Sequence, residues 1–401
     1  MQQEDMMKKT GLISELKNTV SSQIHKYTMI IALIAIWIFF QIVTKGIFLT
    51  PRNINNIFLQ MCFIGIASCG MVFVMVAAQI DLSVGSVIGF TGSIIAVLIR
   101  NHNMNIVPAL AITLVIGLLI GIWHGFWVAY MGLPAFIVTL ASQMIFRGGV
   151  MGVTQGSTIQ PNNDAFKAIG QGYLPSLFEF KDYNTTPLIV GILCIIAYIV
   201  LSIRTRKSRQ SYEFEVSSLP SFILKMIFMS VVIYSVFVVW ALDRGIPVPM
   251  VILFVVVAIM NVISKRTPFG RHVYAIGGNS EATQLSGVNV KLTMLLIFSL
   301  MGILSAISGV VYTSRLNSAA IAGGTGTETD IIASAIIGGT SPSGGTGTII
   351  GCIIGALVMA SLENGMSLLS LGSFEKYVIK GLVLLFAVAV DVQTRKRRGI
   401  V

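Results

Sequence analysis

Side chains that could carry out catalysis are few in this sequence and stand apart from one another. The four histidines and four cysteines are scattered, with no Cys-x-x-Cys, no His-Glu-x-x-His and no cysteine–histidine cluster, so we expect no metal site. No Gly-x-x-x-x-Gly-Lys-[Ser/Thr] loop occurs, and the chain therefore has no recognisable site of its own for ATP phosphates. Because no nucleophile and no paired acid and base stand out, we expect neither an enzymatic activity nor a cofactor.

Polar residues that could handle a small solute lie in two glycine-rich stretches. The first is AAQIDLSVGS at 77–86, and the second is IIGGTSPSGGTGT at 336–348. Their hydroxyl, amide and carboxylate groups are candidates for lining a translocation path: Gln79, Asp81, Ser83, Ser86, Thr340, Ser341 and Ser343. For Asp81 an alternative stays open, in which its carboxylate simply caps a helix that begins at Ser83.

Both stretches interrupt long apolar segments, and these segments define the class of protein. The chain has 401 residues, of which 55% are hydrophobic and only 11% are charged, whereas soluble domains carry about 25% charged residues. Uncharged runs recur along the whole chain, and about 20 helical residues suffice to cross a hydrocarbon core. We therefore expect an all-α polytopic membrane protein with about 10–12 transmembrane helices, some of them broken.

Broken helices in corresponding halves of a membrane protein point to a transport pathway. The apolar sequence after the first interruption, from Ser86, reads SVIGFTGSIIAVL. The one after the second interruption, from Thr348, reads TIIGCIIGALVMA and is weakly similar to it. This likeness suggests an internal duplication. Within the apolar runs we recognise only Asp81 and Glu363 as acidic residues, and this scarcity argues against ion-coupled transport.

Glycines recur every four residues in two of the apolar runs. They lack side chains on one helix face, so neighbouring backbones can approach closely. We expect a helix-packing role for Gly117, Gly121, Gly125, Gly347, Gly351 and Gly355.

Basic residues give the expected topology. The net charge is +11, and 17 of the 27 Lys and Arg lie in the tail 1–26 and in 204–225, 265–291 and 395–398. The positive-inside rule places these stretches and both termini in the cytoplasm, so membrane lipid rather than nucleic acid is the expected neighbour. Residues 27–393 then form the transmembrane domain, with a basic tail at 394–401. The polar segment 154–186 would form a small docking surface on the opposite side.

The cytoplasmic segment 265–291 contains the sequence GGNSEATQLSG. Asn279 or Ser280 can cap a short helix, Glu281 suits its first turn, and Gly287 would end it. We expect Glu281 and Gln284 to face outward, and Ala282 and Leu285 to pack against the spans. Two interpretations stay open, an ordinary interhelical loop or an element that docks with a soluble partner.

Three stretches carry a resemblance to a known family. GGNSEATQLSGVNV, AAQIDLSVGSVIGFTGS and IIGGTSPSGGTGTIIGCIIGAL resemble signature regions of the permease subunits of sugar ABC importers of the ribose, xylose, galactose and multiple-sugar types. The similarity extends over about 53–391. Residues 204–247 add a basic loop and a helix, a layout that looks more like the xylose and multiple-sugar permeases.

The resemblance implies a coupling helix that docks on an ABC ATPase subunit. The residues that match it are Gly277, Gly278, Asn279, Glu281, Ala282, Ser286 and Gly287, with Thr283 where the family motif has alanine.

The resemblance also implies the assembly and its location. Two copies of the chain would form the path, and a periplasmic or lipid-anchored sugar-binding protein would deliver a monosaccharide, xylose or a related aldose or pentose. The complex would lie in the bacterial cytoplasmic (inner) membrane. The alternatives are an ion-coupled secondary transporter of a small polar solute and a channel, and neither would need an ATPase.

Overall fold

The computed structural model describes residues 24–180, 183–214, 216 and 218–397, and most of these residues are helical. The predicted tails at 1–26 and 394–401 fall largely outside them. Two short strands, β1 (Glu179–Phe180) and β2 (Tyr183–Asn184), pair as an antiparallel hairpin. The helices are α2 (Ile24–Val43), α3 (Pro51–Val76), α4 (Val84–Arg100), α5 (Ile106–Ala129), α6 (Ala135–Thr154), α7 (Asp164–Gln171), α8 (Thr185–Ser211), α9 (Leu219–Ala241), α10 (Val248–Arg266), α11 (Pro268–Gly278), α12 (Ser280–Leu285), α13 (Val290–Leu316), α14 (Thr327–Ile337), α15 (Ile349–Leu368) and α16 (Ser373–Arg397).

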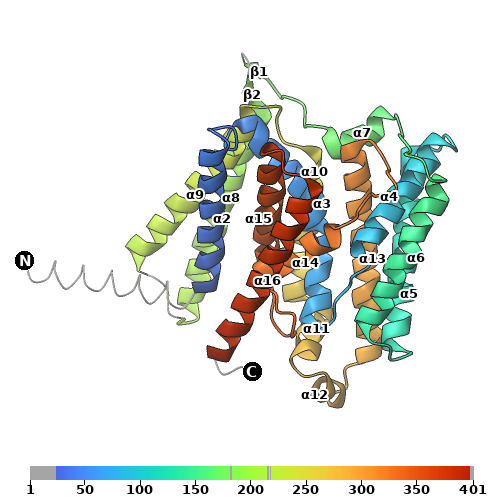
Figure 1. Cartoon of the computed structure of the whole chain (residues 1–401). Coiled ribbons are helices and arrows are strands. Elements are labelled where there is room, and N and C mark those ends of the chain that lie inside the picture. The colour runs from blue at the N-terminus through green and yellow to red at the C-terminus, as the bar shows by residue number, and fades with distance from the viewer. Residues whose placement is uncertain (1–23, 181–182, 215, 217, 398–401) are drawn as a thin grey trace, which may run out of the picture.

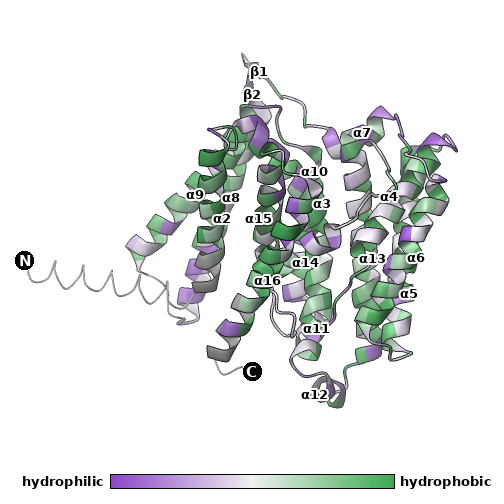
Figure 2. Ribbon diagram, in the orientation of Figure 1, coloured by the Kyte–Doolittle hydropathy of each residue, from purple (hydrophilic) through white to green (hydrophobic). Residues whose placement is uncertain are grey.

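Apolar helices dominate the described chain. Eight of them are long and apolar enough to cross a membrane, namely α3, α5, α6, α8, α9, α10, α13 and α15. Helices α2 and α16 run beside them, and apolar residues cover most of the length of the bundle (Figure 2). The prediction of an all-α polytopic membrane protein is confirmed.

The two ends of the bundle differ. Helix α12 and the end of α16 lie at one end, whereas α7 and the β1–β2 hairpin lie at the other (Figure 1). We call these the α12 end and the α7 end.

Helix α3 is the centre of the fold. It is apolar on all sides, and 94% of its most apolar stretch is buried, as expected for a helix without a polar face. Helices α10, α13, α14 and α15 pack around it. Helices α5, α6, α8 and α9 lie farther out and expose many apolar side chains, which suits contact with lipid.

The first glycine series lies where α5 crosses α13. A Cβ at Gly121 would overlap the carbonyl oxygen of Phe298, and one at Gly125 would lie 2.7 Å from the Cα of Leu295. Gly117 faces Gly302 in the same way. These contacts place the helix backbones against each other, as small residues allow.

The second glycine series divides between a helix and a loop. Gly355 lies on α15 against the Ser334 carbonyl oxygen of α14, and Gly351 lies against Gly338. Gly347 instead precedes α15, where a Cβ would lie 2.8 Å from the Val76 side chain.

Helices α8 and α9 form a hairpin at the edge of the bundle and correct one prediction. We expected a basic loop from Arg204, but α8 continues as a helix to Ser211. At a rise of 1.5 Å per residue, this helix is about 40 Å long, and a hydrocarbon core is about 30 Å thick. The helix therefore carries Arg204–Arg209 past the core, because no glycine or proline stops it there.

Both predicted interruptions are present. Residues 77–83 separate α3 from α4, and residues 338–348 separate α14 from α15. Gly339, Gly344 and Gly345 adopt φ angles of 84°, 88° and 74°, which other residues adopt only with strain. The internal duplication stays a prediction.

Candidate functional site

Helices α11 and α12 form a compact element at the α12 end, and local sequence explains their bounds. The Thr267 hydroxyl accepts a hydrogen bond from the Gly270 amide and caps α11, with Pro268 in its first turn. The Asn279 side chain accepts a bond of 2.9 Å from the Ala282 amide and caps α12. Gly287, at φ 86°, follows the helix end.

Glu281 and Gln284 of α12 are exposed, as predicted, but the predicted packing of Ala282 and Leu285 against the spans is wrong. Thr283 is the buried residue, and its hydroxyl donates to the Asn279 carbonyl oxygen at 2.7 Å. Ala282 is exposed, and Leu285 is 85% exposed. Because Glu281 and Leu285 are one helical turn apart, they share the face opposite Thr283. Helix α12 therefore presents an acidic and an apolar side chain together to the exterior.

Helix α11 connects this exposed element to the centre of the fold. A Cβ at Gly277 would overlap the carbonyl oxygen of Val76, the last residue of α3. The same Val76 oxygen accepts a bond of 2.9 Å from the Gly345 amide, and the Tyr274 hydroxyl donates to the Gly347 oxygen at 2.8 Å. Helix α11 thus touches both the end of α3 and the 338–348 loop.

The first group of predicted path residues is mostly buried. Asp81 is 2% exposed, and its Oδ1 accepts hydrogen bonds from the amide and the hydroxyl of Ser83 at 2.8 and 2.6 Å. Helix α4 begins directly after Ser83, so Asp81 supports the turn before that helix. Ser86 is also buried, whereas Gln79 is half-buried.

The second group lies in the folded 338–348 loop. Thr340 and Ser341 are buried, whereas Ser343 is exposed. Gly344 packs against Ala78, so the structure brings the two glycine-rich stretches into contact. Their assignment to a solute path stays a prediction.

Sequence reasoning missed a network of ion pairs that joins α14, α15 and α16. Lys380 Nζ lies 2.9 Å from Asp330 Oδ2 and 2.7 Å from Glu363 Oε2. Lys376 Nζ lies 3.0 Å from Glu363 Oε1. Asp330 is almost fully buried, at 4% exposed. The helical bundle therefore contains more buried or partly buried charged side chains than we expected, and within the described residues these four are paired with one another.

We missed the network because Asp330 falls between two apolar runs and its partner is 50 residues away. One signal was present in the sequence. Lys376 and Lys380 are four residues apart, which places both on one face of a helix in an otherwise apolar region.

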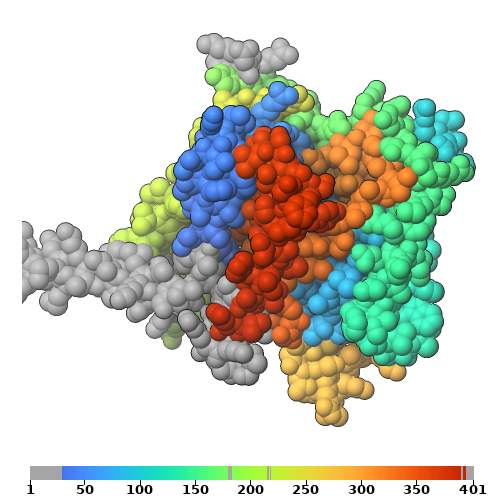
Figure 3. Space-filling view, viewed as in Figure 1, coloured from blue at the N-terminus to red at the C-terminus, as the bar shows by residue number. Residues whose placement is uncertain are grey.

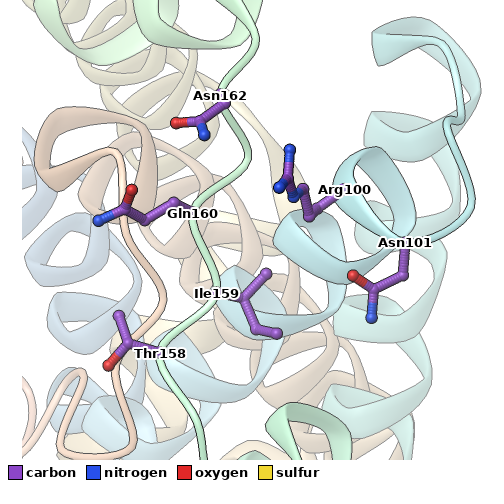
Figure 4. Close-up of a pocket in the computed structure, with 6 residues that line it drawn as sticks. All are labelled: Arg100, Asn101, Thr158, Ile159, Gln160 and Asn162. Atoms are coloured by element: carbon purple, nitrogen blue, oxygen red, sulfur yellow. The ribbon is translucent and has the colours of Figure 1, made fainter.

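The α7 end carries a polar hollow of about 290 Å³. Its lining residues come from the end of α4 and from the segment after α6: Arg100, Asn101, Thr158, Ile159, Gln160 and Asn162. Figure 4 shows that the Arg100 side chain extends alongside the backbone segment that carries Asn162. The hollow belongs in part to the segment that we predicted as a docking surface.

A second polar cluster at the same end ties the loops to α3. The buried Asn55 donates a hydrogen bond to Asp243, and the Arg244 guanidinium lies 5.9 Å from the Tyr173 ring centroid. Burial raises the pKa of Tyr173 and nearby Asp243 adds to the rise, while Arg244 opposes it. The phenol therefore stays neutral at physiological pH.

No group of three or more potential metal ligands occurs among the residues that the structure describes. The arrangement instead combines broken helices with the exposed helix α12, and the adjoining helix α11 contacts the end of α3 and the 338–348 loop. Broken helices of this kind are typical of membrane transport subunits.

Comparison with known proteins defines the family. Residues 53–388 match the family described as branched-chain amino acid transport system / permease component, and the chain belongs to this permease family. It shares 40% identity over 377 residues with the xylose transport system permease protein of Haemophilus influenzae, covering 94% of this chain and 98% of that protein.

Two further relatives are similar over most of their length. The xylose transport system permease protein of Escherichia coli K12 shares 39% identity over 390 residues, covering 97% of this chain and 96% of that protein. The ribose import permease protein of Bacillus subtilis shares 33% identity over 348 residues, 86% of each chain. No solved structure matches the chain.

Proposed function

We propose that this chain is the membrane-spanning subunit of an ATP-driven monosaccharide importer, with xylose as the favoured substrate. The family match and the names of the xylose and ribose permeases that resemble it support this function. Two copies of the chain form the translocation path, and a separate ABC ATPase subunit hydrolyses the ATP. This division of labour agrees with the lack of a phosphate-binding loop in the sequence.

The contacts of α11 carry the proposal. The ATPase docks on the exposed face of α12, which includes Glu281 and Leu285. Movement of α12 passes through α11 to Val76 at the end of α3 and to the 338–348 loop. Both broken stretches then shift together, since packed interfaces switch between discrete arrangements rather than deform continuously. This shift exchanges the outward-open and inward-open states.

The remaining partners follow from the two ends of the bundle. The α12 end faces the cytoplasm, because the basic residues of α8 and α10 gather at the helix termini there. A periplasmic or lipid-anchored sugar-binding protein docks at the α7 end. The membrane is the bacterial inner membrane, with both termini of the chain in the cytoplasm.

The test is purification of the tagged chain from its native membrane, followed by ATP-driven uptake in proteoliposomes. We expect an ATPase subunit to co-purify and to be lost with Glu281→Lys, while the variant stays in the membrane. Normal ATP-driven uptake by Glu281→Lys would exclude docking through α12.

An ion-coupled secondary transporter is the second candidate, and the charges Asp330, Glu363 and Lys380 favour it more than the sequence indicated. The two functions differ in their energy source. We expect uptake to continue when the ion gradient is dissipated at constant ATP, and uptake that stops under this condition would favour the secondary transporter.

A further inference from the structure

One face of the described chain combines irregular backbone with charged side chains at membrane depth. Between the end of α13 and the start of α14, residues 317–326 are not helical. Gly323 in this segment lies against Gly89 of α4, eleven residues before Arg100 ends that helix. At 1.5 Å per residue, Gly89 is about 16 Å below the α7 end of α4, about halfway through a hydrocarbon core.

The side chains on this face come from four elements, namely α6, the 317–326 segment, the first turn of α14 and α16. Arg147 of α6 donates from Nη1 to the Gly323 oxygen at 3.0 Å, and Gln143 of α6 donates to Glu328 Oε1 at 3.4 Å. On the other side, Gly326 lies against the ring of Tyr377 in α16. Helix α6, the 317–326 segment, the start of α14 and α16 therefore form one continuous surface.

This surface is open in the single chain. Thr325 and Ala322 are exposed, Tyr377 is 57% exposed, and Gln143 and Arg147 are half-buried. Figure 3 shows the orange part of the chain between α16, in red, and the teal helices α5 and α6.

Lipid cannot cover such a surface. Irregular backbone at membrane depth occurs only inside protein or beside a water-filled cavity, and charged side chains at this depth face the same two environments. A fully dry cover would also remove water from Arg147 and Glu328, at a cost of several kcal/mol unless each gained new hydrogen-bond partners. Water against this face satisfies both requirements.

The chemistry of the face suits a neutral sugar. Amide, carboxylate, guanidinium and hydroxyl groups can each exchange hydrogen bonds with sugar hydroxyls, and Tyr377 adds an aromatic ring. We propose that Gln143, Arg147, Thr325, Glu328 and Tyr377 form one wall of the water-filled sugar path, which a second copy of the chain completes. This proposal rests on the proposed function, and it places the wall at residues other than the mostly buried ones predicted from the sequence.

The test is thiol labelling, in the assembled transporter, of variants that each carry one added cysteine. The background carries Cys194→Ser, because Cys194 is exposed whereas Cys62, Cys69 and Cys352 are buried. Three variants are compared, Thr325→Cys on the proposed wall, Val115→Cys on the apolar face of α5, and Lys45→Cys beyond the end of α2. The probe is a bulky, charged methanethiosulfonate reagent, which reacts only with thiols in contact with water.

We expect Thr325→Cys to react at least about tenfold faster than Val115→Cys and to lose ATP-driven sugar uptake after labelling. Lys45→Cys should also react but keep its uptake. The proposal is overturned if Thr325→Cys is as unreactive as Val115→Cys, or if it reacts and uptake continues. Ala322→Cys, on the same exposed segment, replaces Thr325→Cys if that variant fails to assemble.

Failure of the proposed function gives a different result. If the Cys194→Ser background, before any labelling, takes up no sugar with ATP, the proposed importer function is contradicted. The labelling rate of Thr325→Cys still reports whether this face contacts water.

Discussion

Leu285 offers a quantitative test of the coupling element, because it is an apolar side chain that is 85% exposed. Substitution by alanine removes three carbons. At about 0.8 kcal/mol for each buried carbon, full burial of this side chain by the ATPase subunit predicts a loss of about 2 kcal/mol in binding. Since 1.4 kcal/mol changes an equilibrium constant tenfold, Leu285→Ala should weaken ATPase binding about 30-fold.

The assay measures the Kd of the ATPase subunit for the chain held in lipid nanodiscs, together with the thermal stability of the chain alone. The stability of Leu285→Ala should not change, because the side chain contributes little to the core. Leu253→Ala is the matched control. That residue is 1% exposed and lies in the core, so the substitution should destabilise the chain by about 2–5 kcal/mol. An unchanged Kd for Leu285→Ala would refute docking through this face.

Three further predictions concern other parts of the molecule. Gly277→Ala should lower uptake but keep ATPase binding, because the added Cβ overlaps the Val76 carbonyl oxygen at a cost of about 1–3 kcal/mol. The control, Gly278→Ala, should behave as wild type, because no atom lies within 4 Å of its added Cβ. Equal uptake by the two variants would contradict a role for the contact between Gly277 and Val76. Lys380→Met should destabilise the chain by about 3–5 kcal/mol, because it leaves the buried Asp330 unpaired. Adding Asp330→Asn should restore most of the lost stability. A melting curve that shows no recovery in the double variant would argue against the ion pair between Lys380 and Asp330. Arg100→Glu should reduce stimulation of ATP hydrolysis by the sugar-binding protein, and unchanged stimulation would exclude this hollow from docking.

The sequence predicted those features that depend on neighbouring residues. Runs of apolar residues gave the membrane-spanning helices, and the two glycine-rich stretches gave the interruptions at 77–83 and 338–348. Asn279 was one of two predicted caps of α12, and its side chain does accept the hydrogen bond. Each of these features is set within a few residues, by hydropathy, by backbone freedom or by a capping side chain.

Orientation and long-range pairing could not be predicted in this way. The six residues of α12 are too few for a helical period to indicate a buried face, and Thr283 rather than Leu285 turned inward. The end of α8 was also misjudged, since hydropathy marks where the membrane ends and not where the helix does.

What the sequence by itself determined is an all-α membrane protein of the permease family, with two interruptions and a capped helix between two spans. Only the tertiary structure decided which of these parts touch. Packing brought Gly277 against Val76, Lys380 against Asp330 and Arg147 against Gly323. The physical reason is that hydropathy and capping act over one or two helical turns. A contact between residues 50 to about 200 positions apart depends instead on how the whole bundle excludes lipid and pairs its buried charges.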